Sequence, residues 1–140
     1  MRALDTNILA RFFVDDPDDA QALEQRPAAV AALSQRSFVP VTVILEFEWV
    51  LRGFYKLPKI EITRVFRALA SIEHLTLEDR DSVLAAIDWF GKGLDFADAL
   101  HLARSLRASA FLTFDQQLAN RSKNLAVGPK VELLVVEPAA

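Results

Sequence analysis

The chain has 140 residues and a net charge of −3, and 52% of its residues are hydrophobic, which suits one domain with a core of its own. It contains no cysteine, which excludes a disulfide framework, thiolate metal ligands and a cysteine nucleophile. The negative charge is unusual for a protein that binds nucleic acid, unless the acidic side chains gather in one site and a metal neutralises them there.

Apolar periodicity and turn residues divide the chain into short strands that alternate with helices. In chain order we expect a strand at 2–5, helices at 8–13 and 20–35, a strand at 37–41, helices at 42–52 and 60–72, a strand at 74–77, helices at 79–90 and 95–106, a strand at 110–113, a helix-like segment at 116–120 and a strand at 131–136. The first strand is too short to assign alone, but the helical pattern after it favours strand, turn and helix.

Capping residues mark several of the predicted helix ends. The acidic turn at 15–19 is expected to cap the next helix, with Pro17 near its first turn. Pro27 interrupts that helix and is compatible with two short helices instead of one. Thr42 is expected as the N-cap of the following helix, which carries Glu46 in its second turn.

This alternation predicts the α/β class, with a central parallel sheet of four to five short strands and helices on both faces, a three-layer α/β/α arrangement. Repeats, linkers and low-complexity segments are absent from the sequence, so we expect a single domain over residues 1–140. The sequence shows neither a signal peptide nor an apolar run of the roughly 20 residues that a membrane span needs. We therefore expect a cytoplasmic protein.

Four carboxylates that are far apart in the sequence are expected at one edge of this sheet. Asp5 and Asp115 each follow a predicted strand, and Glu46 lies in the first turns of the helix after the second strand. Asp98 lies in the first turn of a helix whose preceding loop comes from the same side. Because ligands of an open parallel sheet bind beyond the carboxyl ends of its strands, we expect one acidic pocket.

A cluster of this kind needs a cation, because like charges at close range raise one another's pKa. With one Met and two His in the chain, the ligands must be mainly oxygen atoms, which Mg²⁺ and Mn²⁺ prefer. Such an ion activates water and neutralises a phosphodiester oxygen. The sequence contains neither a serine–histidine triad nor a phosphate-binding glycine loop, so the predicted chemistry is metal-dependent hydrolysis of nucleic acid.

Four segments in order, at 4–9, 43–52, 95–101 and 112–115, resemble the PIN-domain ribonucleases and more closely the VapC-type toxins of bacterial toxin–antitoxin pairs. The similarity spans nearly the whole chain. It implies a three-layer PIN-like fold and Mg²⁺- or Mn²⁺-dependent cleavage of RNA. It also implies a homodimer and inhibition by a cognate, VapB-like antitoxin.

The resemblance also assigns roles by position. It implies core metal-site acids at Asp5, Glu46 and Asp98. Asp115 matches a fourth acid that is less uniform in the family and compatible with a role through water. Asn7 and Thr113 match polar positions that support the pocket, and Asp95 adds an acid beside the core set, as a helix cap or an outer neighbour.

Several of these residues also have purely structural interpretations. Asp5 is also typical of a turn residue whose carboxylate accepts hydrogen bonds from neighbouring amides. Asp115 is also typical of an N-cap of the segment that begins at Gln116. Asp98 lies at the favourable N-terminal end of a helix dipole, which explains this residue only in part. Glu46 lies in an apolar stretch and is hard to explain as a solvated residue, because burying an unpaired carboxylate is costly.

Three neighbours of the candidate acids have alternatives of their own. Glu48 lies about 200° around the helix from Glu46 and is expected at the surface or in a salt bridge. His101 is expected to pack or form a hydrogen bond rather than bind metal. Thr113 either packs at the strand end or supports Asp115 by a hydrogen bond.

Other functions are weighed against the same residues. A haloacid-dehalogenase-type phosphatase would carry a second Asp where this chain has Asn7, and the pattern of a receiver-type signalling domain is not met. A PIN-type nuclease of RNA processing and a partner-binding PIN module without catalysis remain alternatives to a toxin. The basic residues that either flank the pocket and hold phosphates or are solvated surface charges are Arg11, Arg52, Lys56 and Lys59.

Overall fold

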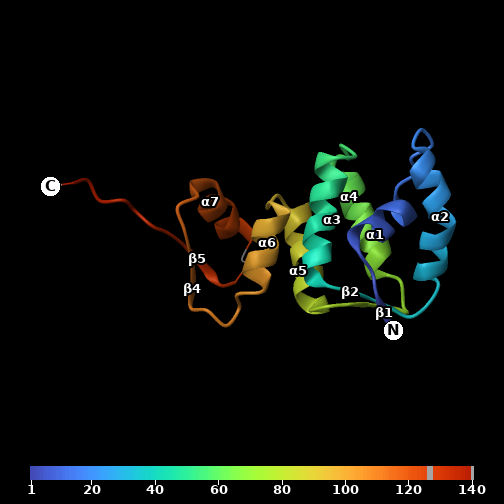
Figure 1. Ribbon diagram of the computed structural model, residues 1–140. Helices are drawn as coiled ribbons and strands as arrows, with labels where there is room; N and C mark the ends of the chain where they lie inside the picture. The colour runs from blue at the N-terminus through green and yellow to red at the C-terminus, as the bar shows by residue number, and fades with distance from the viewer. Residues whose placement is uncertain (126–127, 140) are drawn as a thin grey trace. The chain divides into compact units, whose positions relative to one another are not determined.

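The computed structural model describes residues 1–125 and 128–139 (Figure 1). The chain divides into two compact units, Met1–Val83 and Leu84–Ala140. The first unit contains β1 (Arg2–Ala3), α1 (Thr6–Phe13), α2 (Ala20–Leu33), β2 (Ser37–Val39), α3 (Val41–Gly53), α4 (Lys59–Ala70) and β3 (Leu75–Leu77). Helix α5 (Arg80–Gly91) starts in the first unit, and α6 (Phe96–Ala103), β4 (Ala110–Thr113), α7 (Gln116–Leu125) and β5 (Lys130–Leu133) belong to the second.

The first unit is built on a parallel sheet of three strands in the order β1-β2-β3. Ala3 pairs with Phe38, and Phe38 pairs with Thr76 on the other side. The pairing of β1 and β2 is extended by Leu4, whose amide donates to the Phe38 carbonyl at 2.9 Å. Because these strands are parallel, the segment after β1 and the start of α3 leave the sheet at the same edge.

A row of phenylalanines forms the core of the first unit. The ring of Phe47 lies 6.1 Å from that of Phe13 on α1 and 6.0 Å from that of Phe66 on α4, centroid to centroid. On α3 the buried residues Ile44, Phe47 and Leu51 recur at helical spacing, so the opposite face of this helix is available to solvent. Helix α1 packs against both α2 and α3. This packing fixes the start of α1 relative to α3.

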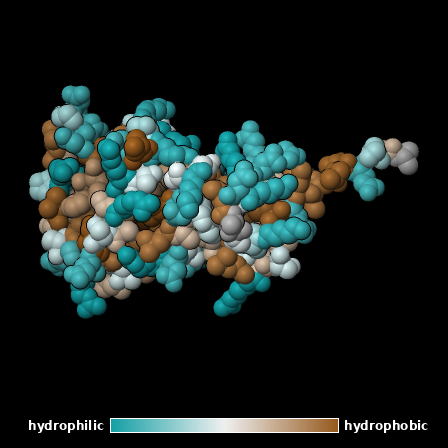
Figure 2. All heavy atoms as spheres, turned by 180° about the vertical axis from the view of Figure 1, so that it is seen from behind, coloured by the Kyte–Doolittle hydropathy of each residue, from teal (hydrophilic) through white to brown (hydrophobic). Residues whose placement is uncertain are grey.

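The second unit contains a parallel pair of strands, β4 and β5, with Phe111 opposite Val131. Phe96 at the start of α6 is fully buried and meets Phe90 edge to face, with ring centroids 5.6 Å apart. Beyond β5 the residues 134–139 have no regular structure, and apolar side chains line the first part of this tail (Figure 2). The predicted strand at 131–136 is therefore wrong at its end, because β4 offers no pairing partners beyond Thr113.

The α/β class with parallel strands is as predicted, and all five strands described are parallel to their neighbours. They form two sheets rather than one continuous hydrogen-bonded sheet. None of the helices described combines the length and the hydrophobicity that a membrane span requires.

Two local predictions are wrong. Thr42 is not an N-cap, because Pro40 holds that position and α3 starts at Val41, whose amide donates to the Glu78 carboxylate at 2.8 Å. Pro27 does not divide α2, which is one helix with buried residues on both sides of the proline. At the start of α3 a contact with a distant segment adds to the local geometry, and in α2 the burial of residues on both sides of Pro27 outweighs the local preference.

The acidic turn at 15–19 caps the helix that follows it, as predicted. Asp19 is the N-cap of α2, and its carboxylate accepts from the amides of Gln21 and Ala22 at 3.0 and 3.2 Å. Pro17 lies in the turn before the helix rather than in its first turn.

Candidate active site

Asp5 connects the end of β1 to the start of α1. It is the N-cap of this helix, and its Oδ1 accepts from the Thr6 amide at 2.8 Å. The interpretation that Asp5 accepts hydrogen bonds from neighbouring amides is therefore confirmed for its Oδ1. Its Oδ2 has no hydrogen-bond donor among the residues that the structure describes, and the side chain is exposed. Asp5 can cap the helix and still offer an oxygen to a ligand.

Glu46 lines the same pocket as Asp5. The pocket is formed by Asp5, Thr6, Asn7, Glu46 and Val50, so α1 and α3 both contribute to it. Glu46 is exposed on the face of α3 opposite the buried residues. The interpretation that Glu46 is not a solvated residue is therefore wrong, because its apolar neighbours face the core and Glu46 faces solvent. The two acids from distant parts of the sequence share one cavity wall.

Thr6 joins these two elements and was not recognised from the sequence. It is one of the few buried polar residues of the described chain, and its hydroxyl donates to Oε1 of Glu46, 40 residues away. This bond fixes Oε1 and leaves Oε2 of Glu46 without a donor from the described residues. The only sequence signal is a hydroxyl next to Asp5, which by itself is compatible with a simple helix start.

Replacing Thr6 by Val removes this hydrogen bond while almost preserving the side-chain volume. Because partners that orient a metal-binding side chain are typically worth 10–100-fold in activity, we expect kcat/KM to fall by about that factor. The measurement is RNA cleavage by Thr6→Val beside Thr6→Ser, which keeps the hydroxyl and should stay close to the parent chain. Equal activity of the Val variant would show that Glu46 needs no such support.

In the second unit, Asp98 lies in the first turn of α6. Asp95 is the N-cap of this helix, as predicted, and its Oδ2 accepts from the Asp98 amide at 3.3 Å. Partial burial raises the pKa of Asp98 above its ordinary value of 3.8. The charges of Asp95 and Asp115 raise this pKa further, and His101 opposes them. The carboxylate of Asp98 thus lies among like charges and favours a cation.

Asp115 follows β4 and caps α7. Its Oδ1 accepts from the amides of Gln117 and Leu118 at 2.9 and 3.2 Å. The Thr113 hydroxyl accepts from the Asp115 amide at 3.0 Å, so Thr113 supports Asp115 by a hydrogen bond, as one of the two interpretations proposed. Asp115 therefore has the predicted capping role and keeps Oδ2 without a described donor.

The neighbouring residues have structural roles. Glu48 is buried, so the surface alternative is wrong, and the salt-bridge alternative is correct, with Arg52 Nε at 2.9 Å from its carboxylate. Glu48 faces the interior because it lies about 200° around α3 from the exposed Glu46. His101 stacks on Phe111 with ring centroids 6.5 Å apart, as expected of a packing residue.

A hard divalent cation suits these donors. Each of the four acids keeps at least one carboxylate oxygen that accepts no hydrogen bond from the described residues, and oxygen is the ligand that Mg²⁺ and Mn²⁺ prefer. Within the described ranges, no group of three or more His, Asp or Glu side chains is close enough to hold a metal ion. The structure brings Asp5 together with Glu46 in one unit, and Asp98 together with Asp95 and Asp115 in the other.

The family model described as the PIN domain matches residues 2–124, a range that includes both units' acids. No curated protein matches the chain.

Proposed function

The chain belongs to the PIN domain family, whose members are generally metal-dependent nucleases, and from this premise we propose that it is a Mg²⁺- or Mn²⁺-dependent endoribonuclease. Family membership agrees with the predicted α/β fold class and its parallel strands. The match spans most of both units, which supports the proposal that they form a single domain.

The observation that carries this proposal is the pocket in which Asp5 and Glu46 meet. Their oxygens come from two helices that leave the same edge of a parallel sheet, and one oxygen of each is held by Thr6. A carboxylate pair placed only for solubility would have no reason to share a cavity wall and a common buried partner. The pair instead presents two free oxygens on a rigid base, which suits ligand binding.

We assign the metal to Asp5, Glu46 and Asp98, with Asp115 as the fourth acid. When bound, the ion supplies an activated water and neutralises the phosphodiester oxygen during cleavage. The chain contributes the orientation of these oxygens. Thr6 and the start of α1 hold the first two acids, and the start of α6 holds Asp98 beside the charge of Asp115. Asn7 in the pocket wall has no hydrogen-bond partner among the described residues and is available to substrate.

We further propose that the protein acts in the cytoplasm as the toxin of a VapC-type toxin–antitoxin pair and that a VapB-like antitoxin inhibits it. The support is the resemblance of four ordered segments, which is closest to the toxin branch of the family. A homodimer is part of this proposal. The exposed aromatic residues Trp49 and Phe54 at the C-terminal end of α3 lie within the apolar helices that could supply its interface.

The function is tested by incubating purified protein with RNA and separating the products on a gel. We expect cleavage with Mg²⁺ or Mn²⁺ and none with EDTA. If a short reading frame immediately upstream encodes a VapB-like protein, we expect no cleavage after its product is added. Cleavage that persists in EDTA would contradict the metal-dependent mechanism. Metal-dependent cleavage that the upstream product leaves unchanged would instead favour a PIN nuclease of RNA processing.

A further inference from the structure

A second cavity lies beside the pocket of Asp5 and Glu46, between α1 and α2. Its volume is about 170 Å³, and it is lined by Asn7, Ile8, Arg11, Gln25, Ala28 and Ala29. A single water needs only about 10–15 Å³ on a comparable scale, so the cavity can hold a larger group. Its walls combine small apolar side chains with two amides and one guanidinium. Among the four basic residues considered from the sequence, only Arg11 lines it.

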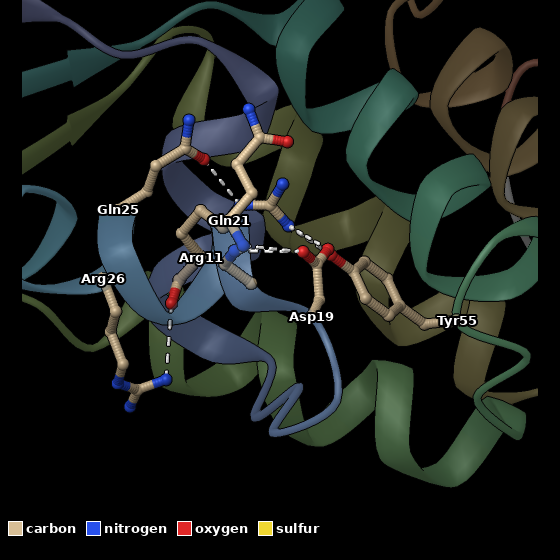
Figure 3. A network of polar contacts seen from close by, with 7 residues as sticks. Arg11, Asp19, Gln21, Gln25, Arg26 and Tyr55 are labelled. Atoms are coloured by element: carbon tan, nitrogen blue, oxygen red, sulfur yellow. Dashed lines mark hydrogen bonds and ion pairs between the residues drawn. The ribbon is translucent and has the colours of Figure 1, made fainter.

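The guanidinium of Arg11 is held from several sides, as Figure 3 shows. Its Nε donates to Oε1 of Gln25 at 2.8 Å, and its Nη1 donates to the hydroxyl of Tyr55 at 3.1 Å and lies 3.9 Å from Oδ2 of Asp19. These partners come from α2, from the turn before it and from the segment between α3 and α4. The side chain is mostly buried, at 16% exposure.

This network leaves one nitrogen of the Arg11 guanidinium without a hydrogen-bond acceptor among the described residues. No acceptor among the described residues takes the two hydrogens of Nη2, so that nitrogen can donate to a ligand. Among the described residues, Asp19 is the only carboxylate in contact with Arg11, and its other oxygen is used to cap α2. Arg26 adds a second positive charge, since its Nη1 donates to the Arg11 carbonyl at 3.3 Å. The cavity side of α1 and α2 therefore carries two guanidinium groups, next to the acidic turn at 15–19 whose Asp19 pairs with Arg11.

Asn7 connects the two cavities, because it lines both of them. Arg11 follows Asn7 by four residues on α1, which places it one turn along the same helix face, about 6 Å further along the axis. This separation is of the size of one nucleotide step in an RNA strand. A strand with one phosphate beside Asn7, in the pocket that Asn7 shares with the acids, can therefore reach the guanidinium with a neighbouring phosphate.

We propose that the cavity between α1 and α2 is a subsite for the RNA backbone, in which Nη2 of Arg11 binds the phosphate adjacent to the one that is cleaved. The inference rests on the proposed nuclease function and names a position of the substrate beyond the reacting bond. A guanidinium suits this role because its planar donors match phosphate oxygens and it stays charged at all relevant pH values. A backbone contact of this kind adds affinity without regard to base sequence.

The test is the dependence on KCl concentration of binding to fluorescent single-stranded RNA, measured by anisotropy without divalent cations and with Asp98→Asn in every protein to prevent cleavage. In this parent, Arg11→Gln should raise Kd about tenfold for all sequences at low salt. The slope of log K against log salt should become shallower by about 0.7, the value for one phosphate of a single strand. Arg11→Lys should keep the slope of the parent.

Two further variants keep the test decisive. Arg64→Gln removes the same charge from α4, where Arg64 pairs with Glu61 at 2.7 Å and does not line the cavity, and should leave the slope unchanged. Asp19→Asn keeps a good helix cap but removes the counter-charge of Arg11, so it should tighten RNA binding. If Arg11→Gln does not fold, the affinity of Asp19→Asn for RNA tests the subsite instead.

The outcomes separate this inference from the proposed function. An unchanged slope in folded Arg11→Gln, or unchanged affinity in Asp19→Asn, overturns the phosphate subsite even if the wild-type chain cleaves RNA with Mg²⁺. Failure of the parent to bind RNA overturns the subsite, and failure of the wild-type chain to cleave RNA overturns the nuclease proposal.

Discussion

Replacing Asp5 or Asp98 by Asn is expected to reduce RNA cleavage by more than about a hundredfold while the fold persists. Loss of residues that merely orient metal ligands costs 10–100-fold, so loss of a ligand itself should cost more. The change is small in shape, because Asn is about as good an N-cap as Asp and Oδ1 of residue 5 can still accept from the Thr6 amide. The substitution removes the negative charge of the carboxylate, whose Oδ2 in Asp5 accepts no hydrogen bond from the described residues.

The measurement is kcat/KM on one RNA substrate at saturating Mg²⁺, with circular dichroism as the check on folding. Asp88→Asn is the matched control, because Asp88 is exposed and paired with Lys92 at 3.2 Å on α5. This control should keep the activity of the parent chain. Full activity of both Asp5→Asn and Asp98→Asn would remove the basis of the metal-dependent mechanism.

The second large effect concerns stability without metal. Burial and the charges of Asp95 and Asp115 raise the pKa of Asp98 in the folded protein above 3.8, its ordinary value and the one expected after unfolding. The folded state therefore binds this proton more tightly than the unfolded state does. The free energy of unfolding therefore decreases as pH rises from about 3.8 through the folded pKa of Asp98. Above the folded pKa, the destabilisation by the ionised Asp98 is present in full. At neutral pH, metal-free Asp98→Asn should melt at a higher temperature than the parent.

Divalent cations should reverse this order. An ion that binds only the folded state at a hundred times its Kd stabilises it by about 2.7 kcal/mol, which is several degrees of Tm for a chain of this size. We expect Mg²⁺ to raise the Tm of the parent and to have little effect on Asp98→Asn. Melting curves from pH 3.5 to 7.5, with EDTA and with Mg²⁺, give both comparisons. A metal-free parent as stable as Asp98→Asn at every pH would contradict this account.

Most of the helices and strands could be predicted because their signals are local. The apolar spacing of Ile62, Phe66 and Leu69 predicts α4 without knowledge of any other segment. The same kind of signal predicts that the acidic turn at 15–19 caps α2 and that Asp95 caps α6, since a capping side chain bonds to amides two or three residues ahead. Errors arose where a distant group intervened, as Glu78 does at the start of α3.

The four carboxylates of the predicted pocket have unequal support. Asp5 and Glu46 lie in one pocket, and Asp98 lies in the field of Asp115. The assignment of all four to one metal site stays a prediction, and the Asn variants test it most directly. Asp115 has a second role as the cap of α7, so its replacement would be harder to interpret than that of Asp98.

The sequence by itself determined the α/β class, the order of elements, the acids and the resemblance to a nuclease family, because periodicity, caps and short motifs are properties of neighbouring residues. Only the tertiary structure decided that Thr6 holds Glu46, that Glu48 is the buried acid of α3, and that Arg11 lines a cavity shared with Asn7. Each of these depends on which distant segments pack against α1 and α3. Packing is cooperative over the whole unit, so no local pattern reports it.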